Sequence, residues 1–407
     1  MTFRPRLRPI IFQPIIHQEQ QLLWLRDPWD LSDRRLVFPR ALAQVLPYCD
    51  GRRTPHDIHR DFVDLIGQDV SFELIHEVLE ALDDAYLLDN ERSQEVIKEH
   101  LAAYRAQSQR PPALAGISYP AFSEHLTDLF EDFESGIQSN DQPDWPVRGI
   151  VSPHIDYQRG GPIYAGVWLQ AAHSILTADL VIILGTDHNG TPGSITLTRQ
   201  AYATPYGRLP TELNIVDALA EAIGPETAFA EELNHRGEHS IELSAVWLHY
   251  LYKQAAVTPS PMIPILVGSF QHHLDSGTHP ADDPRITGLL NTLSHETSGR
   301  RTVVVASVDL AHVGPTFGDD FFMDAERRDQ LRREDDGLIK SLLSGDSLGL
   351  FRQISDIRDR NRICGFSPLY LLSRYLCQTE GIQSGYRQCP ADENDASLVS
   401  ICGLLLK

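Results

Sequence analysis

Three apolar, β-branched segments of this sequence end in histidine, which is the commonest metal ligand in its neutral form and a frequent general base near neutral pH. "GIVSPH" ends at His154, "VIILGTDH" ends at His188, and "VVVASVDLAH" passes through Asp309 to His312. Taken singly, each is better explained as a hydrogen-bonded or surface histidine, because the chain has 17 of them. Three at equivalent positions indicate a shared site, since the carboxyl ends of strands in an α/β sheet meet at one edge.

Two further segments supply candidate ligands for the same edge. Cys364 in "RICGFSPLYLLSRYL" stands at the expected start of a helix, where amide groups and a bound metal would favour its thiolate. Its alternative interpretation is a small buried hydrophobic residue. His239 in "NHRGEHSIELSAVWL" could line the site from the start of another helix. Glu238 and Glu242, in the same segment, are more simply explained as favourable charges in the first helical turn.

The elements that must position these residues follow from the alternation of patterns after residue 110. Short β-branched runs, "VRGIVSPH", "LVIILGTDH", "PMIPILVGS" and "RTVVVASVDLAH", are separated by helical segments such as "IYAGVWLQAAHSIL" and "HSIELSAVWLHYLYKQ". This alternation predicts an α/β sheet with helices on both faces. "GTDHNGTPG" lacks the spacing of a phosphate loop, and the chain has no Gly-x-Ser-x-Gly elbow, so neither ATP use nor serine hydrolysis is supported.

The first 95 residues predict a separate, small winged-helix-like α+β domain. "LLWLRDP" and "RLVFPR" favour short strands, and "ALAQVLPYCDG" favours a helix. Thr54, Pro55 and Asp57 form a helix start that Gly67 would end, and Ser71 starts a further helix before a closing strand at "AYLL". We therefore predict domains over residues 1–95 and 111–407, joined by a linker helix over residues 96–110.

Composition restricts the partners and the compartment. The 407 residues carry a formal net charge of −21, which disfavours nonspecific binding to nucleic acid or to an anionic membrane. Prolines interrupt the apolar residues near the N-terminus, and no run approaches the roughly 18 apolar residues that span a bilayer. Five cysteines, an odd number, predict no disulfide framework. We expect a soluble, cytoplasmic protein with neither nucleic acid nor membrane as partner.

An ordered set of segments beginning near Arg110 resembles the Memo family, which includes AmmeMemoRadiSam system protein B and is similar in fold to class III extradiol dioxygenases of the LigB type. These segments are "RPPALAGISYP", "PHIDYQRGGPIYA", "ILGTDHNG", "EHSIELSAVWLHYL", "VASVDLAHVG", "ICGFSPLYLL" and "ASLVSICGLLL". Near the N-terminus, "CDGRRTPHDI" and "VLEALDDAYLLD" resemble the PqqD-like winged-helix domains that accompany radical SAM enzymes.

The resemblance implies roles for six residues. His154, His188 and Cys364 match the metal-site positions of the family, and Asp309, His312 and His239 match further pocket residues, for which we expect catalytic roles. The dioxygenases have a carboxylate where Cys364 falls. A thiolate there shifts the preference toward softer or more redox-labile metals, so iron or copper is the expected cofactor.

Three functions remain open on these grounds. The first is a metal-binding, redox-related protein that acts with a radical SAM partner and recognises a peptide through its first domain, by addition of a strand to a sheet edge. The second is a non-haem iron dioxygenase acting on an aromatic diol, with His312 as base. The third is a non-catalytic scaffold for a peptide or other ligand. Asp156, in "PHIDY" where the family more often has "PHAGY", could be a ligand or a turn cap. The oligomeric state also remains open.

Overall fold

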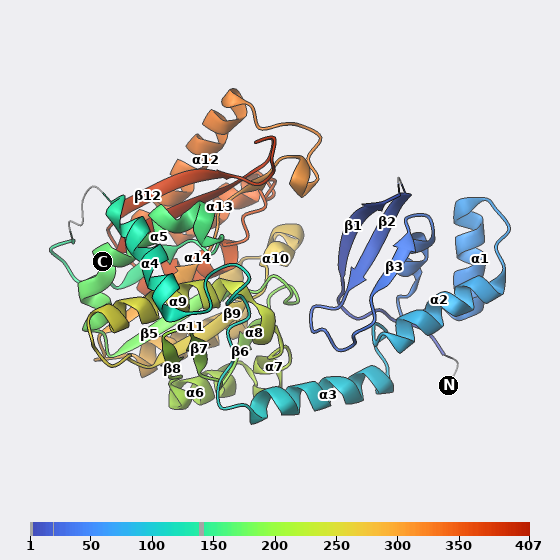
Figure 1. The fold of residues 1–407 in the computed structure, drawn as a ribbon, viewed down its shortest axis with the longest axis horizontal. Coiled ribbons are helices and arrows are strands. Elements are labelled where there is room, and N and C mark those ends of the chain that lie inside the picture. The colour runs from blue at the N-terminus through green and yellow to red at the C-terminus, as the bar shows by residue number, and fades with distance from the viewer. Residues whose placement is uncertain (1–2, 19, 138–141) are drawn as a thin grey trace. The chain divides into compact units, whose positions relative to one another are not determined.

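The computed structural model describes residues 3–18, 20–137 and 142–407 (Figure 1). The chain divides into two compact units, Met1–Ala106 and Gln107–Lys407. The first holds a small antiparallel sheet with helices, and the second holds a mixed sheet covered by helices. This arrangement confirms the predicted fold class, an α/β sheet flanked by helices and preceded by a small α+β domain.

In the first unit, an antiparallel sheet of order β1-β2-β3 precedes the helices. Its apolar core contains residues from the sheet and from all the helices except α3, with Val45, Ile58, Ile75 and Leu82 fully buried. The elements are β1 (Ile11–His17), β2 (Gln20–Arg26), β3 (Leu36–Pro39), the 3-10 helix η1 (Leu42–Tyr48), α1 (Pro55–Ile66), α2 (Phe72–Asp84) and α3 (Glu91–Ala106).

The helix ends in this unit follow the predicted signals. Thr54 and Asp57 form a capping box at the start of α1, and Gly67 ends the helix in a left-handed conformation with φ 65°. The Ser71 side chain accepts a hydrogen bond from an amide of α2. The expected closing strand at "AYLL" was wrong, because Tyr86 turns the chain at φ 58° and leaves only an isolated bridge at Leu88.

The eight-stranded sheet of the second unit runs in the order β11-β13-β4-β10-β5-β9-β6, with β12 paired to β13. Its centre is parallel and confirms the four predicted strands: β4 (Gly149–Ser152), β10 (Thr302–Ser307), β5 (Leu180–Thr186) and β9 (Met262–Val267). Antiparallel strands extend both sides: β6 (Ile195–Leu197), β11 (His312–Val313), β12 (Gly381–Pro390) and β13 (Leu398–Leu406). A separate hairpin contains β7 (Tyr202–Thr204) and β8 (Gly207–Leu209).

Helices cover both faces of this sheet, as predicted. Along β5 every residue is buried, with Ile182 and Leu184 in one apolar core and Val181 and Ile183 in the other. This double burial explains why the strand sequences are continuously apolar.

One core packs the sheet against α6 (Leu213–Ile223), α11 (Pro284–Glu296), α12 (Ala325–Leu343), α13 (Ser347–Asp356) and α14 (Phe366–Leu376), and the other packs it against α4 (Ser123–Ser135), α5 (Tyr157–Leu176) and α9 (His239–Gln254). Short helices α7 (Pro225–Ala228), α8 (Asn234–Gly237) and α10 (Gln271–Ser276) complete the unit with η2 (Pro280–Asp282) and η3 (Pro315–Phe317). Across the described residues, every helix is too short or too polar to cross a membrane.

Candidate metal centre

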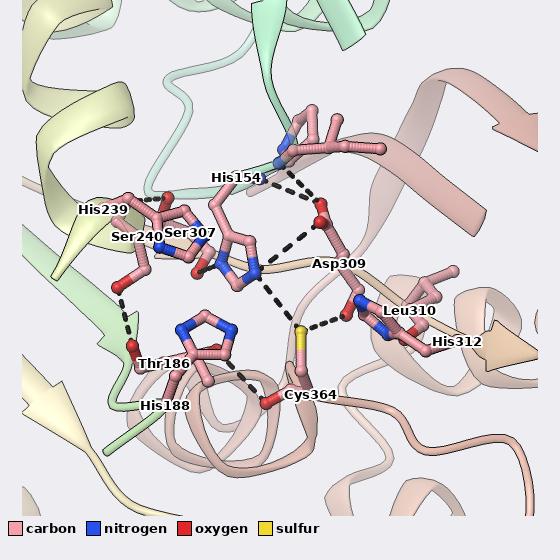
Figure 2. Close-up of polar contacts among 12 residues, drawn as sticks. His154, Thr186, His188, His239, Ser240, Ser307, Asp309, Leu310, His312 and Cys364 are labelled. Atoms are coloured by element: carbon pink, nitrogen blue, oxygen red, sulfur yellow. Dashed lines mark hydrogen bonds and ion pairs between the residues drawn. The ribbon is translucent and has the colours of Figure 1, made fainter. Parts of the chain in front are cut away.

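The candidate site lies where the central parallel strands end. Ser307, the last residue of β10, is paired with Ser152 of β4 and with Gly185 of β5. The segments that leave these strands therefore start side by side, as the expectation of a shared edge requires. Figure 2 shows the result, with His154, His188, His239, Asp309, His312 and Cys364 gathered in one place.

His154 is the buried histidine of this group, with 2% of its surface exposed. Its Nδ1 lies 3.0 Å from the carbonyl oxygen of Ser307, so the Nδ1 proton is donated there and the lone pair is on Nε2. Nε2 lies 3.3 Å from Sγ of Cys364 and 3.6 Å from Oδ2 of Asp309. Burial lowers the pKa of His154 to about 3, which keeps the ring in the neutral form that binds metals.

Three imidazoles lie next to one another. The ring centroids are 5.0 Å apart for His154 and His188, 5.2 Å for His154 and His239, and 4.7 Å for His188 and His239. Each residue offers one ring nitrogen, and these atoms all lie within 4.8 Å of one another. His239, for which the sequence suggested a catalytic role, thus belongs to the same cluster as the two histidines expected to bind a metal.

Glu238 holds two of these rings in place. Its Oε1 lies 3.0 Å from Nδ1 of His188 and 3.0 Å from Nδ1 of His239, so the other nitrogen of each ring, Nε2, does not contact this oxygen. His188 also makes a side-chain hydrogen bond with Cys364. The carboxylate also accepts hydrogen bonds from the backbone amides of His188, His239 and Ser240. Burial acts to raise the pKa of Glu238, but His188 outweighs it and holds this pKa well below its usual range.

The sequence had favoured a simple helix charge for Glu238, and this interpretation was incomplete. The carboxylate does cap α9, as expected of an acidic residue at a helix start. It also joins the end of β5 to α9 through His188. In the sequence, the position of Glu238 directly before His239 was the only sign that it contacts an imidazole. The contact with His188, which is 50 residues away in the chain, could not be inferred from the sequence.

Cys364 reaches the group from the segment that precedes α14. Besides the contact with His154, its Sγ donates to the carbonyl oxygen of Asp309 at 3.6 Å, and Thr186 at the end of β5 donates to the carbonyl oxygen of Cys364 at 3.2 Å. Loss of contact with water raises the pKa of the thiol, while His188 acts to lower it. A cation held between this thiol and the imidazoles would favour the thiolate.

Asp309 and His312 lie beside the group on the segment that follows β10. Asp309 accepts hydrogen bonds from the backbone amides of His154 and Ile155, and so fixes the turn after β4. Nδ1 of His312 lies within 3.2 Å of the carbonyl oxygens of Leu310 and Arg362, so its proton is held there and Nε2 carries the lone pair. Burial lowers the pKa of His312.

A cavity of about 480 Å³ opens onto these side chains. Its polar wall contains His154, His188, His239, Asp309 and His312. The remaining lining mixes apolar side chains with a few polar ones: Leu114, Ser118, Ile155, Asp156, Arg159, Leu243, Thr316, Phe317, Ala391 and Val399. A small or medium-sized organic ligand with an apolar body and a polar end fits this character.

Asp156 caps the turn, which answers the question that the sequence left open. Its side chain accepts a hydrogen bond from the backbone amide of Arg159 at 3.1 Å and pairs with the Arg159 guanidinium at 2.6 Å. Both residues line the cavity, and Arg159 is a lining residue that the sequence had not suggested. Charged side chains at a turn after a strand are common, so sequence alone offered no reason to select this arginine.

The segment "RPPALAGISYP" is fastened to α9 by a buried network. Glu242 forms an ion pair with Arg110 and accepts a hydrogen bond from the Tyr119 hydroxyl at 2.5 Å. It also accepts hydrogen bonds from the backbone amides of Ala113 and Leu114, each at 2.8 Å. Arg110 also donates to the backbone carbonyl of Glu238, at the start of α9. The earlier interpretation of Glu242 as a helix charge was therefore also incomplete, because this carboxylate anchors one wall of the cavity.

Comparison with known proteins places this geometry in a family context. The family of Memo-like proteins matches residues 110–403. A MEMO1 family protein of Aquifex aeolicus (strain VF5) is 27% identical over 388 residues, covering 94% of this chain and 95% of that protein. Another, from Methanosarcina mazei, is 28% identical and covers 64% of this chain and 83% of its own length. A structure of the heterocyclase TruD matches at 14% identity and a TM-score of 0.16, which is too low to support any argument.

Proposed function

The chain belongs to the family of Memo-like proteins, and from this premise we propose that its cavity holds a single redox-active metal ion that acts on a small organic ligand. The observation that carries the proposal is the convergence of three imidazole nitrogens within 4.8 Å, with Sγ of Cys364 3.3 Å from one of them. Nδ1 of each ring is also fixed by a contact with a carbonyl or carboxylate oxygen. Such a contact at the second ring nitrogen is a usual feature of metal-binding histidines.

The donor set fits iron or copper. His154, His188 and Cys364 would hold the ion, and His239 offers a further nitrogen. Imidazole suits both metals, and a thiolate favours the softer, more redox-labile choice. The bound ion would supply one-electron chemistry or activate oxygen. Ring opening of an aromatic diol, the second function considered, is less favoured because the thiol stands where a carboxylate is expected.

The protein's own residues would orient the ligand and move its proton. His312 lines the cavity with a lone pair on Nε2. Its lowered pKa favours the neutral imidazole, which is the form that can accept a proton. Asp309 would keep His154 in place through its backbone amide. Leu243, Phe317 and Val399 would exclude water from the apolar part of the ligand.

Metal analysis of anaerobically purified protein tests the proposal. We expect about one iron or copper ion per chain in the unaltered protein and a large loss in Cys364→Ala. Cys377→Ala is the matched control, because Cys377 is exposed and lies at the end of α14. Equal metal content in all three proteins, or none in any, would contradict the proposal.

We further propose that the first unit recognises a peptide or a partner protein, in a system that includes a radical SAM protein. A groove of about 750 Å³ supports this, because its lining is mostly apolar and includes Phe12, Pro14 and Ile16 of β1. Within the described residues β1 pairs only with β2, so its outer side is a sheet edge. Ile16 is largely exposed and Phe12 is about half exposed, and exposed apolar patches commonly mark interaction sites.

Binding of the full chain to an array of short extended peptides tests this second role. Ile16→Arg should abolish the signal, since it places a charge in the groove. Leu65→Arg is the control, because Leu65 is an equally apolar, exposed residue of the same unit on α1 and lies outside the groove lining. The proposal fails if both variants bind every peptide like the unaltered protein, or if both lose binding together.

A further inference from the structure

We propose that His272, His273 and Asp283 form a second metal site, separate from the cavity described above, that binds zinc. His272 and His273 lie on α10, and Asp283 precedes α11. One ligand atom from each of the three residues lies within 4.8 Å of the other two, and the two imidazole centroids are 4.0 Å apart. None of these residues lines the first cavity.

The two histidines have buried nitrogens that need a partner. His273 is 5% exposed, and its Nδ1 lies 2.9 Å from Oγ1 of Thr278, while its Nε2 is buried without a hydrogen-bond partner in the part of the chain that the structure describes. Nδ1 of His272 is buried and lacks such a partner in the same range of residues. Because buried polar atoms are nearly always satisfied, one such atom on each of two adjacent rings points to a cation as their partner.

The contact with Thr278 allows the ring of His273 a suitable tautomer. If Nδ1 donates its proton to Thr278, Nε2 carries the lone pair, and a hydrogen bond from the second nitrogen is a usual feature of metal-binding histidines. The ring of His272 is held from the other side by Gly193. A Cβ added at Gly193 would come within 2.6 Å of Cε1 of His272, so the loop backbone packs directly on the ring.

Asp283 supplies the negative charge. Its side chain is 11% exposed, and its Oδ2 accepts the more exposed Arg285 guanidinium at 2.8 Å. Its Oδ1 accepts hydrogen bonds from the Arg285 backbone amide at 2.8 Å and from Arg285 Nε at 3.3 Å. A carboxylate offers about four lone-pair positions, so it can serve an ion and the guanidinium together. Two imidazoles and a carboxylate suit zinc, which completes its tetrahedral shell with a fourth ligand or water.

Such an ion would join α10 to the start of α11 across the intervening loop. Because the unfolded chain cannot offer the same three ligands together, metal binding would stabilise the folded state. The proposal depends on side chains that take no part in the first centre. It can therefore succeed or fail independently of the redox function.

The test uses the full chain with the first centre disabled by His154→Ala, His239→Ala and Cys364→Ala. Zinc is titrated against a chromophoric chelator, and cobalt(II) serves as a spectroscopic probe. We expect about one zinc ion per chain in this background and an affinity more than about 100-fold weaker after His273→Ala, beyond the usual effect of changing an outer-shell group. His295→Ala, on the exposed face of α11, should bind like the background.

A background chain that binds no zinc would overturn the proposal, as would an unchanged affinity after His273→Ala. Circular dichroism establishes that each variant is folded. If His273→Ala is unfolded, Asp283→Asn replaces it, because an asparagine retains the helix cap. Asp283→Asn should then weaken zinc binding and alter the cobalt absorption bands. An unaltered affinity and spectrum in this variant would also refute the site.

Discussion

Replacement of Glu238 by glutamine should weaken metal binding without unfolding the protein. Glutamine has the same shape and keeps one carbonyl oxygen for the amides at the start of α9, but it lacks the charge that both His188 and His239 contact at 3.0 Å. The side chain is 2% exposed, so water cannot replace the lost interaction. The change therefore isolates the electrostatic support of the two imidazoles.

The size of the effect follows from these contacts. A hydrogen bond to a charged group contributes about 1.5–3 kcal/mol, against about 0.5–1.5 kcal/mol for a neutral pair, so each imidazole loses about 1 kcal/mol of support. Two such losses total about 2 kcal/mol, or a roughly 30-fold weaker affinity at about 1.4 kcal/mol per tenfold change. This value lies within the 10–100-fold range typical of groups that hold metal-binding histidines.

An anaerobic competition titration with cobalt(II) and a chromophoric chelator measures this change. Glu226→Gln is the matched control, because Glu226 is an exposed acidic residue in the first turn of the short helix α7. We expect the control to bind as the unaltered protein does. An affinity of Glu238→Gln within twofold of the control would show that the carboxylate does not support the centre.

Three other predictions concern stability. Burial raises the pKa of Asp335 from 3.8 to about 6, so the folded state favours the neutral acid. The free energy of unfolding therefore falls as pH rises from about 4 through about 6, where the buried side chain must ionise. Asp335→Asn should remove this loss, which is about 3 kcal/mol at pH 7. In urea unfolding at about pH 5 and pH 7, the free energy of unfolding of the variant should therefore change less with pH than that of the unaltered protein. An equal change in both proteins would contradict this. Glu242→Gln removes the carboxylate that pairs with the buried Arg110 and should lower the unfolding free energy by about 3–5 kcal/mol in urea titrations. A change below about 1 kcal/mol would contradict the importance of this network. Thr54→Ala removes the capping box of α1 and should cost about 1 kcal/mol in thermal unfolding, where an unchanged midpoint would be the contrary result.

Sequence patterns sufficed for the elements that follow local rules. The four parallel strands were predicted because burial on both faces makes their sequences continuously apolar. The ends of α1 were predicted from Thr54 and Gly67, because caps depend on residues adjacent in the chain. β13 was not predicted as part of the sheet, since its antiparallel pairing with β4 joins segments about 250 residues apart.

The same distinction applies to the site. Strand-end positions identified His154, His188 and His312 because parallel strands must end at one edge. The function of Glu238 could not be derived in this way, because one carboxylate serves as a helix cap and as the partner of two imidazoles. The pair of His272 and His273 was likewise missed, because two adjacent histidines on a short helix give no sign of a third ligand. Asp283 comes close to them only through the conformation of the loop between α10 and α11.

X-ray absorption spectroscopy of the iron- or copper-loaded protein tests the central claim most directly. We predict that the metal is surrounded by one sulfur scatterer at about 2.3 Å and two or three imidazole nitrogens at about 2.0–2.1 Å, close to the distances known for zinc bound by thiolate and histidine. The sulfur should vanish in Cys364→Ala and persist in Cys377→Ala. A shell made only of oxygen, or a sulfur signal that survives Cys364→Ala, would contradict a metal centre built from these side chains.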